Sequence, residues 1–467
     1  MSTNQQSIER IGLSLFVILT GSFLAPLLMH SSTLAIPAIA TELRLDAEAL
    51  SWFTLLNVLG NACLILPAGK LADIYGRRRL FCIGLLISGL SCVLGGMAIS
   101  SDMILAGRLL QGVGGAFIFG SSMALVSGIP PENQKARVMG IYIAICYMGI
   151  VAGPLFGGAI LKYLHWRWVF HIPGAILLTT CVVGFGMLNW ERYGDRNTRL
   201  RLLDTSLYMG SLILIALAVF KTSQLSGQLM MLFGILLFAG FCWFQSKRRD
   251  PLLQVTLFRD NPVYATLGIT HLLSYSGILG LPFVATLYLQ YIKAIDPQTT
   301  GVILLVQALF TAIVAPAGGW MSQRFRVRSI LMFGMLVLLA GMVGFATLHA
   351  NSSLWHIVLA LSSVGVAVGL VDTHLLRICL ASVEERLLGS ASATLNGLRT
   401  VGGFIGIGII SYLMGSTIGK REISPELYPA LMNVLHNFFI VASILTFFAL
   451  ALLCIAIRIR SRKQIRG

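Results

Sequence analysis

A few ionisable side chains lie inside long apolar runs of the sequence, where a charge is costly and usually serves a function. Asp372 is the only one of the 18 acidic residues that lies well within such a run. Gly365 and Gly369 precede it on the same helical face, so we expect the carboxylate to point towards a closely packed helix. We predict that Asp372 is a protonation site. The alternative is an interfacial carboxylate that pairs with Arg377.

Two arginines also lie within apolar runs. Arg108 is followed by Gln111 and Gly112 on one helical face, which places a guanidinium beside a smooth groove. A buried guanidinium needs a cavity or a partner, unless the side chain extends to the nearby membrane interface. Arg399 shares its face with several glycines. Its partner could be Asp372, an anionic substrate or the other half of the protein.

Further polar residues in these runs could line a cavity. They are His30 and Thr33, Asn57 and Asn61, Gln111, and His271 and Tyr275. Because histidine titrates near neutral pH, either His30 or His271 could carry a proton. A histidine in an apolar run is more often a hydrogen-bonded packing residue, and that alternative stays open.

The composition is typical of a membrane protein. The 467 residues are 56% hydrophobic and 11% charged, with a mean hydropathy of +0.84, whereas soluble domains are about a quarter charged. Such sparse charge could not cover a surface exposed to water, so lipid must cover much of the chain. The net charge of +16 resides in short loops between apolar runs, a pattern that membrane topology explains without a nucleic-acid partner.

Fourteen apolar runs are long enough to cross a membrane as helices. They begin near residues 11, 51, 80, 103, 138, 168, 207, 228, 263, 301, 329, 354, 391 and 430. Most of the 34 lysines and arginines fall in alternate loops. The positive-inside rule then places both termini in the cytoplasm.

One segment recurs in the second half of the chain. Gly69–Arg78 follows the second apolar run, and the degraded copy Gly319–Arg328 follows the tenth. Each copy lies between the second and third helix of a half if helices 1–6 and 9–14 form two related halves. We therefore predict an all-α polytopic membrane protein of two pseudo-symmetric six-helix bundles plus two inserted helices. The expected domains are residues 1–190, 191–260 for the insert, and 261–467.

Several motifs occur in order along this pattern. They are Gly69–Arg79, Leu105–Ala116, Gly149–Gly158, Trp166–Phe170 and Leu287–Gln290. The sequence with these motifs resembles the major facilitator superfamily, in its fourteen-helix drug:proton antiporter branch. The glycines of the first motif are expected to permit a tight turn between two spans.

The resemblance implies roles for individual residues. It implies that Asp73 docks the two halves on the cytoplasmic side, although the acid could also be solvated in a basic loop. It assigns proton coupling to Arg108. It links antiport to a fifth-helix motif whose glycines admit a close neighbour and whose proline bends the helix. The residues of that motif are Gly149, Gly153, Pro154 and Gly157.

The expected function is proton-coupled efflux of small amphipathic compounds by alternating access. We expect no enzyme activity, metal or cofactor, because the sequence contains no HExxH, CxxC or GxxxxGK[ST] motif; the proton gradient is then the energy source. The expected partners are a small-molecule substrate, protons and the lipid bilayer, for a monomer in the cell membrane. The alternative is a dedicated exporter or importer of one metabolite or siderophore. Leu28 stands where the branch carries an aspartate, so dications should be poor substrates.

Overall fold

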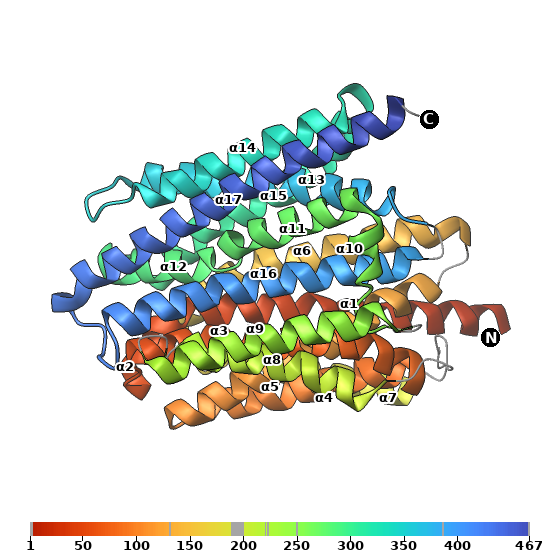
Figure 1. The fold of residues 1–467 in the computed structure, drawn as a ribbon. Helices are drawn as coiled ribbons and strands as arrows, with labels where there is room; N and C mark the ends of the chain where they lie inside the picture. The colour runs from red at the N-terminus through yellow and green to blue at the C-terminus, as the bar shows by residue number, and fades with distance from the viewer. Residues whose placement is uncertain are drawn as a thin grey trace.

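The computed structural model describes residues 3–129, 132–187, 200–219, 221, 224–248, 251–384 and 387–465. Within them every regular element is a helix, and the long helices run side by side (Figure 1). The elements are α1 (Thr3–Leu34), α2 (Ile36–Leu43), α3 (Ala47–Tyr75), α4 (Arg77–Gly96), α5 (Ser101–Gly128), α6 (Glu132–Tyr163), α7 (Trp168–Met187), α8 (Leu202–Val219), α9 (Leu225–Ser246), α10 (Thr256–Asp260), α11 (Pro262–Ile278), α12 (Leu281–Leu287), the π-helix η1 (Tyr288–Ile292), α13 (Pro297–Arg324), α14 (Val327–Ala346), α15 (Leu354–Leu380), α16 (Leu388–Thr417), the 3-10 helix η3 (Pro425–Leu427) and α17 (Tyr428–Ile465).

Fourteen stretches in the described part of the chain are long and apolar enough to cross a membrane. This confirms the predicted number of spans, and most predicted starts lie within a few residues of the observed ones. The ninth span, Pro262–Ile292, differs from a simple rod because it consists of α11, α12 and η1. Pro282 follows the break and has no backbone N–H to continue the hydrogen-bond ladder.

The two halves are built in the same way. In the first, α3 and α4 pack on α5, and α1 packs on α6 and α7. In the second, α13 and α14 pack on α15, and α11 packs on α16 and α17. The halves meet along two equivalent seams, α3 with α16 and α6 with α13.

The helix caps repeat the same symmetry. Asp46 and Asp296 cap the second helix of each half by accepting hydrogen bonds from backbone N–H groups one turn on. They are spaced in the sequence as Gly69 and Gly319 are. Ser100 and Ser353 cap α5 and α15 in the same manner. The internal repeat is therefore also present in the residues that start the helices.

The ends of the bundle are distinguished by the chain termini. α1 begins and α17 ends at one end, here called the terminal end, and the opposite end is called the distal end (Figure 1). At the distal end Gln290 donates a hydrogen bond to the Leu34 carbonyl, 3.0 Å, and Ala47 N–H donates to the Arg421 carbonyl, 3.0 Å. These bonds join the two halves at that end.

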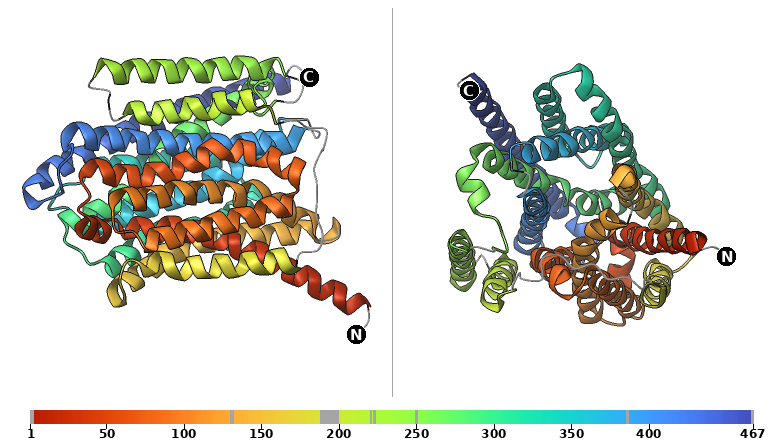
Figure 2. Two further views of the ribbon diagram at one scale, coloured as in Figure 1. Left: turned by 90° about the horizontal axis from the view of Figure 1, so that it is seen from below. Right: turned by 90° about the vertical axis from the view of Figure 1, so that its right-hand side faces the viewer.

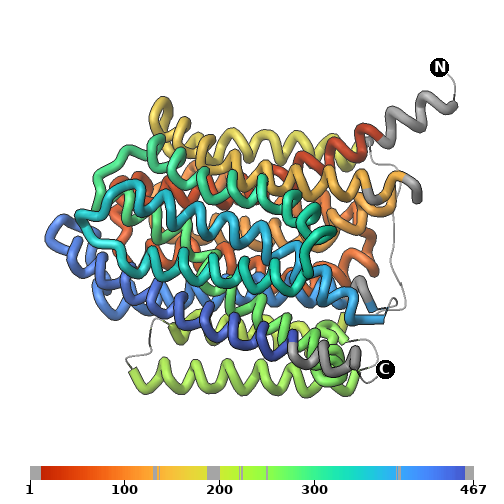
Figure 3. The backbone as a smooth tube through the Cα atoms, turned by 90° about the horizontal axis from the view of Figure 1, so that it is seen from above, coloured from red at the N-terminus to blue at the C-terminus, as the bar shows by residue number. Residues whose placement is uncertain are grey.

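The inserted helices α8 and α9 lie together outside the bundle, on one flank (Figures 2 and 3). α8 covers the α3–α16 seam, where the Tyr208 hydroxyl donates to the Ala62 carbonyl at 2.7 Å. Asp204 in the first turn of α8 is 5% exposed, with Arg248 at 3.5 Å. This buried acid was not predicted, because it precedes the apolar run. The predicted boundary at residue 190 lies outside the described residues.

Candidate functional site

Arg108 on α5 is a fully buried charge, with 1% of the residue exposed. Its guanidinium donates to the Phe53 carbonyl at 3.0 Å, the Ser32 hydroxyl at 2.7 Å and the Gln111 side-chain oxygen at 2.5 Å. It also lies 4.4 Å from the Phe53 ring centroid. Arg108 therefore joins α1, α3 and α5 inside the first half, and it does not extend to the membrane interface.

Asn57 and Gly112 make the close contact between α3 and α5 near this arginine. Asn57 donates to the Arg108 carbonyl at 3.4 Å. A Cβ on Gly112 would lie 2.1 Å from the Asn57 carbonyl oxygen, so glycine is required for the helices to approach this closely. Asn61, one turn further along α3, faces Gly115 and is partly exposed.

Asp372, Tyr275 and Arg399 form a second cluster, contributed by α15, α11 and α16. The Tyr275 hydroxyl donates a short hydrogen bond to the Asp372 carboxylate. The guanidinium carbon of Arg399 lies 4.6 Å from the Tyr275 ring centroid. The predicted Asp372–Arg399 pair is therefore not a direct ion pair, because Tyr275 contacts both groups. The His271 ring lies 4.8 Å from that of Tyr275, and its Nδ1 is buried without a hydrogen-bond partner.

This cluster lies at the boundary between the halves. The charge of Arg399 acts on His30 of α1 and on Tyr147 of α6, both of which belong to the first half. Asp372 and Arg399 are half-buried, as are His30 and Tyr147. The cluster thus brings a carboxylate and a guanidinium together on either side of one tyrosine. Tyr147 was not predicted, although it lies two residues before the antiporter motif.

The predicted surroundings of Asp372 are partly wrong. Gly365 and Gly369 do allow a close approach, but the neighbour is α13, where their Cβ atoms would meet the Gln307 and Thr311 carbonyls. Asp372 is turned to α11 instead. Arg377 donates to Ser322 at 3.0 Å and makes no ion pair with Asp372, so the alternative pairing is absent as well.

The glycines of the fifth-helix motif pack against α1. Cβ atoms on Gly149, Gly153 and Gly157 would lie 2.3 Å from the Phe23 carbonyl, 2.6 Å from His30 Cβ and 3.0 Å from the Ser31 backbone. Pro154 lies on another side of α6, and its carbonyl faces Gly301 of α13 in the other half. The role of the four motif residues in antiport stays a prediction.

Asp73 is paired locally. Arg77 donates to its carboxylate at 2.8 Å, an i, i+4 contact at the turn between α3 and α4. Gly76 makes this turn with φ 106°, which only glycine adopts readily. Gly69 lies within α3, so its predicted role in the turn is wrong. Thr33, another predicted cavity residue, hydrogen-bonds to the Met29 carbonyl of its own helix at 2.8 Å.

A charged cluster outside the spans fastens the distal end of the first half. Glu42 on α2 accepts from Trp166 at 2.6 Å and from Arg167 by a shorter bond, and His165 lies at 2.9 Å. Arg167 also donates to the Ala98 carbonyl at 2.9 Å. Burial raises the pKa of Glu42, but the bonds from Arg167 and Trp166 outweigh it and hold the pKa below its usual value.

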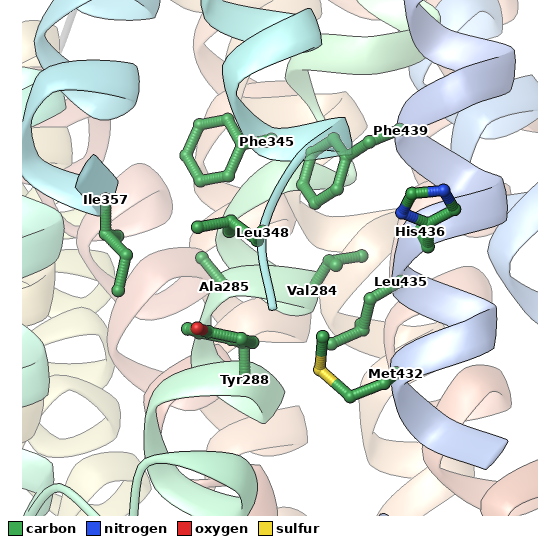
Figure 4. A pocket seen from close by; sticks show the side chains of 10 residues that line it. All are labelled: Val284, Ala285, Tyr288, Phe345, Leu348, Ile357, Met432, Leu435, His436 and Phe439. Carbon is green, nitrogen blue, oxygen red and sulfur yellow. The ribbon is translucent and has the colours of Figure 1, made fainter. Parts of the chain in front are cut away.

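A small apolar pocket lies between α12, α14, α15 and α17 (Figure 4). Its wall includes Phe345, Phe439 and His436. Its volume of ≈ 10 Å³ accommodates about one water molecule. It is therefore too small to hold a transported compound.

Known proteins share this sequence pattern. The family model described as Major Facilitator Superfamily matches residues 18–407 and 267–466. The multidrug resistance protein Stp of Mycobacterium tuberculosis is 29% identical over 89% of this chain and 76% of its own length. The tetracenomycin C resistance and export protein of Streptomyces glaucescens is 28% identical over 87% of this chain and 76% of its own length. The riboflavin transporter RibZ of Clostridioides difficile is 23% identical over 87% of this chain and 89% of its own length.

A solved structure supports the same fold. It is a bacterial homologue of the human lysosomal transporter Spinster, in an inward-facing and unoccupied conformation. It matches with a TM-score of 0.68 and 16% identity, covering 96% of this chain and 97% of that one. Together with the family match over nearly the whole sequence, the helices place this chain among transporters and not among enzymes. The chain belongs to the major facilitator superfamily.

Proposed function

We propose that the protein is a proton-coupled exporter of small amphipathic compounds that works by alternating access as an antiporter. The observation that carries the proposal is the Asp372–Tyr275–Arg399 cluster. It lies at the boundary between the two halves, which alternating access would move against each other, and its carboxylate is half-buried. An ionisable group inside a membrane span is by default a candidate functional site. The names of several relatives, which describe multidrug and antibiotic resistance, support efflux.

Antiport requires that a proton and the substrate exclude each other from the protein on each side of the membrane. Asp372 suits this role because its carboxylate is held by one tyrosine and has no direct cationic partner among the described residues. The proton gradient is the proposed energy source. We propose a monomer in the cell membrane, and the positive-inside pattern supports an orientation with the terminal end in the cytoplasm. In that orientation the distal contacts close the outer side.

The test uses purified protein in liposomes with an imposed pH gradient. Ethidium, riboflavin and fluorescein serve as cationic, neutral and anionic probes. We expect at least one probe to accumulate against its gradient, and a protonophore to abolish that accumulation. Asp372→Asn should lose uphill transport but keep substrate exchange, whereas Asp102→Asn, the same change at an exposed residue, should behave as the wild type. Uphill transport by Asp372→Asn with an unchanged pH dependence would reject Asp372 as the coupling site.

A second candidate is a dedicated transporter of one metabolite. The observation that favours it is Arg399, whose guanidinium donates no hydrogen bond to any described residue and lies against the Tyr275 ring. Such a group can recognise one acidic or polar compound, and one of the relatives is named as a riboflavin transporter. Transport of a single probe would favour this candidate, and transport of chemically unrelated probes would exclude it.

A further inference from the structure

The inserted helices α8 and α9, here called the inserted pair, are attached to the first half. The buried Tyr208 of α8 donates its hydroxyl hydrogen to the Ala62 carbonyl of α3 at 2.7 Å. The thiol of Cys63 on α3 lies 4.0 Å from the Met209 carbonyl oxygen. Apolar side chains of α3 and α8 form one buried cluster around these contacts. The inserted pair is therefore held on α3.

The inserted pair also reaches the second half across the α3–α16 seam. Phe404 and Ile407 of α16 belong to the same buried cluster. In the last turn of α8, Val219 approaches Gly408 of α16, where an added Cβ would lie 3.7 Å from Val219 Cγ2. α8 thus crosses the seam and contacts a helix of each half.

A short segment, Pro251–Asn261, leads from the inserted pair to the second half at the terminal end (Figures 1 and 2). This segment is here called the connector, and its first part is attached to the inserted pair. Leu252 N–H donates to the side-chain oxygen of the buried Gln245 of α9 at 2.6 Å. Just after α9, Arg248 lies 3.5 Å from the buried Asp204 of α8, which joins the two inserted helices at this end.

The last part of the connector is attached to the second half. Leu257 is buried, and the Phe258 ring lies 5.4 Å from the ring of Tyr264 on α11. The Asn261 side chain donates to the carbonyl of Ser382, just after α15, at 2.5 Å. The connector therefore joins two bodies: the inserted pair, which lies on α3, and the second half.

The connector has little slack between its two attachments. Five Cα–Cα steps separate Leu252 from Leu257, so these residues can lie at most about 17 Å apart when the chain is fully extended. The chain is not extended here, because it forms a helical turn whose hydrogen bonds to the Gln254 and Val255 carbonyls measure 3.2 and 3.0 Å. Moving the inserted pair away from the second half must first break this turn.

We propose that the inserted pair and the connector form a strap that holds the halves together at the α3–α16 seam, so that the terminal end opens at the opposite seam, α6–α13. Separation of α3 from α16 would pull against the contacts of the strap with α3, α16 and α11. The α6–α13 seam is free of this restraint. At its terminal end, Gly140 on α6 and Gly319 on α13 have no described atom within 4 Å of an added Cβ.

The strap goes beyond the proposed function, because it would act in a transporter of any substrate and any coupling ion. It rests on one element of that function, alternating access between the two halves. Its test therefore follows distances between helices and does not depend on transport.

The first test compares the two seams in full-length protein in lipid nanodiscs. Spin labels on Tyr75→Cys and Ala393→Cys report the α3–α16 distance, and labels on Gly140→Cys and Gly319→Cys report the α6–α13 distance. All four residues are exposed, and labelled protein without introduced cysteines corrects for the native thiols. We expect the α6–α13 distribution to be the wider. A wider α3–α16 distribution, or two equally wide ones, would refute the strap alone, whereas two narrow ones would refute alternating access as well.

The second test lengthens the strap and leaves both of its attachments in place. Eight glycine and serine residues inserted between Gln254 and Val255 extend its reach by roughly 26–29 Å. The matched control carries the same eight residues after Lys221, between α8 and α9, where the chain does not pass from one half to the other. We expect the insertion in the connector to shift the α3–α16 distances to larger values, and the control to match the wild type. Equal α3–α16 distributions in the two variants would overturn the proposal. The wild-type comparison of the two seams decides the matter even if the lengthened protein folds poorly.

Discussion

Gly301 offers a test of how the two halves hold together at the distal end. It lies on α13 where this helix meets α6 of the other half. A Cβ at this position would lie 2.4 Å from the Pro154 carbonyl oxygen and 3.3 Å from Leu34 Cδ2. The first distance is shorter than real Cβ contacts allow, and the atom in the way belongs to the backbone. Gly301→Ala therefore requires α6 and α13 to separate.

The free-energy cost of Gly301→Ala can be derived from the cost of overpacking. Adding a methyl group to a closely packed interface typically costs about 1–3 kcal/mol. That energy applies only to the conformation in which the distal end is closed, so the equilibrium between conformations should shift by roughly 5- to 150-fold. Alanine also favours the helix over glycine by about 1 kcal/mol. This gain is common to every conformation in which α13 is folded, and it cancels from the equilibrium.

The matched control is Gly319→Ala on the same helix. It adds the same methyl group where no atom lies within 4 Å of the new Cβ. Spin labels on Tyr163→Cys and Trp355→Cys, exposed residues of opposite halves at the distal end, measure the closed population. We expect Gly301→Ala to lengthen this distance and slow transport, and Gly319→Ala to leave both unchanged. Equal distributions in the two variants would refute the inference that the glycine contact closes this end.

Three further predictions use other contacts. Arg108→Lys should lower the melting temperature and the transport rate, because one ammonium cannot reach the three acceptors that the guanidinium fork reaches. Thermal-shift and flux assays measure both effects, and Arg377→Lys, the same change at an exposed site, is the control. The pKa of Glu42 is lowered in the folded protein, so its contribution to stability is complete above its ordinary pKa and is lost as the pH falls through the lowered value. The melting temperatures of wild type and Glu42→Gln should therefore differ at pH 7 and converge as the pH falls below about 4. Asp73→Asn breaks a partly exposed ion pair and should change the free energy of unfolding by less than about 1 kcal/mol. It should nevertheless slow transport if Asp73 docks the two halves in another conformation, whereas an unchanged transport rate would show that Asp73 is only a local partner of Arg77.

The sequence predicted the fold well because a membrane imposes strong local constraints. Each span must be long, apolar and helical, so the apolar runs gave the number of spans. The recurrence of Gly69–Arg78 at Gly319–Arg328 gave the position of the equivalent turns, α3 to α4 and α13 to α14. The break inside the ninth span was missed. Its apolar run is continuous, and only Gly280 and Pro282 indicate a break.

The candidate site was harder to predict, because the spacing of residues on one helical face does not show which other helix packs against that face. Gly365, Gly369 and Asp372 lie on adjacent parts of one surface of α15. Two of them face α13 and the third faces α11, a division that depends on where three helices meet. Tyr275 was identified as a cavity residue, but its position between Asp372 and Arg399 could not be read from i, i+4 spacing.

The neighbouring charges of Asp372 and Arg399 link the charge of the substrate to the direction in which the proton moves. A cation bound near Asp372 favours the ionised acid and competes with the proton, which is the requirement for antiport. An anion bound at Arg399 favours the protonated acid instead, so substrate and proton would bind together and move in the same direction. The proposed antiport therefore requires a substrate that is cationic, or one that excludes the proton sterically. Leu28 stands where the sequence resemblance implies an aspartate on the first helix, so Asp372 is left to meet this requirement. A dication would leave one charge uncompensated, and a monocation would be balanced. Ethidium transport coupled to inward proton flow would fit this reasoning, whereas proton-coupled transport of fluorescein in the same direction as the proton would assign the site to anions and replace antiport by co-transport.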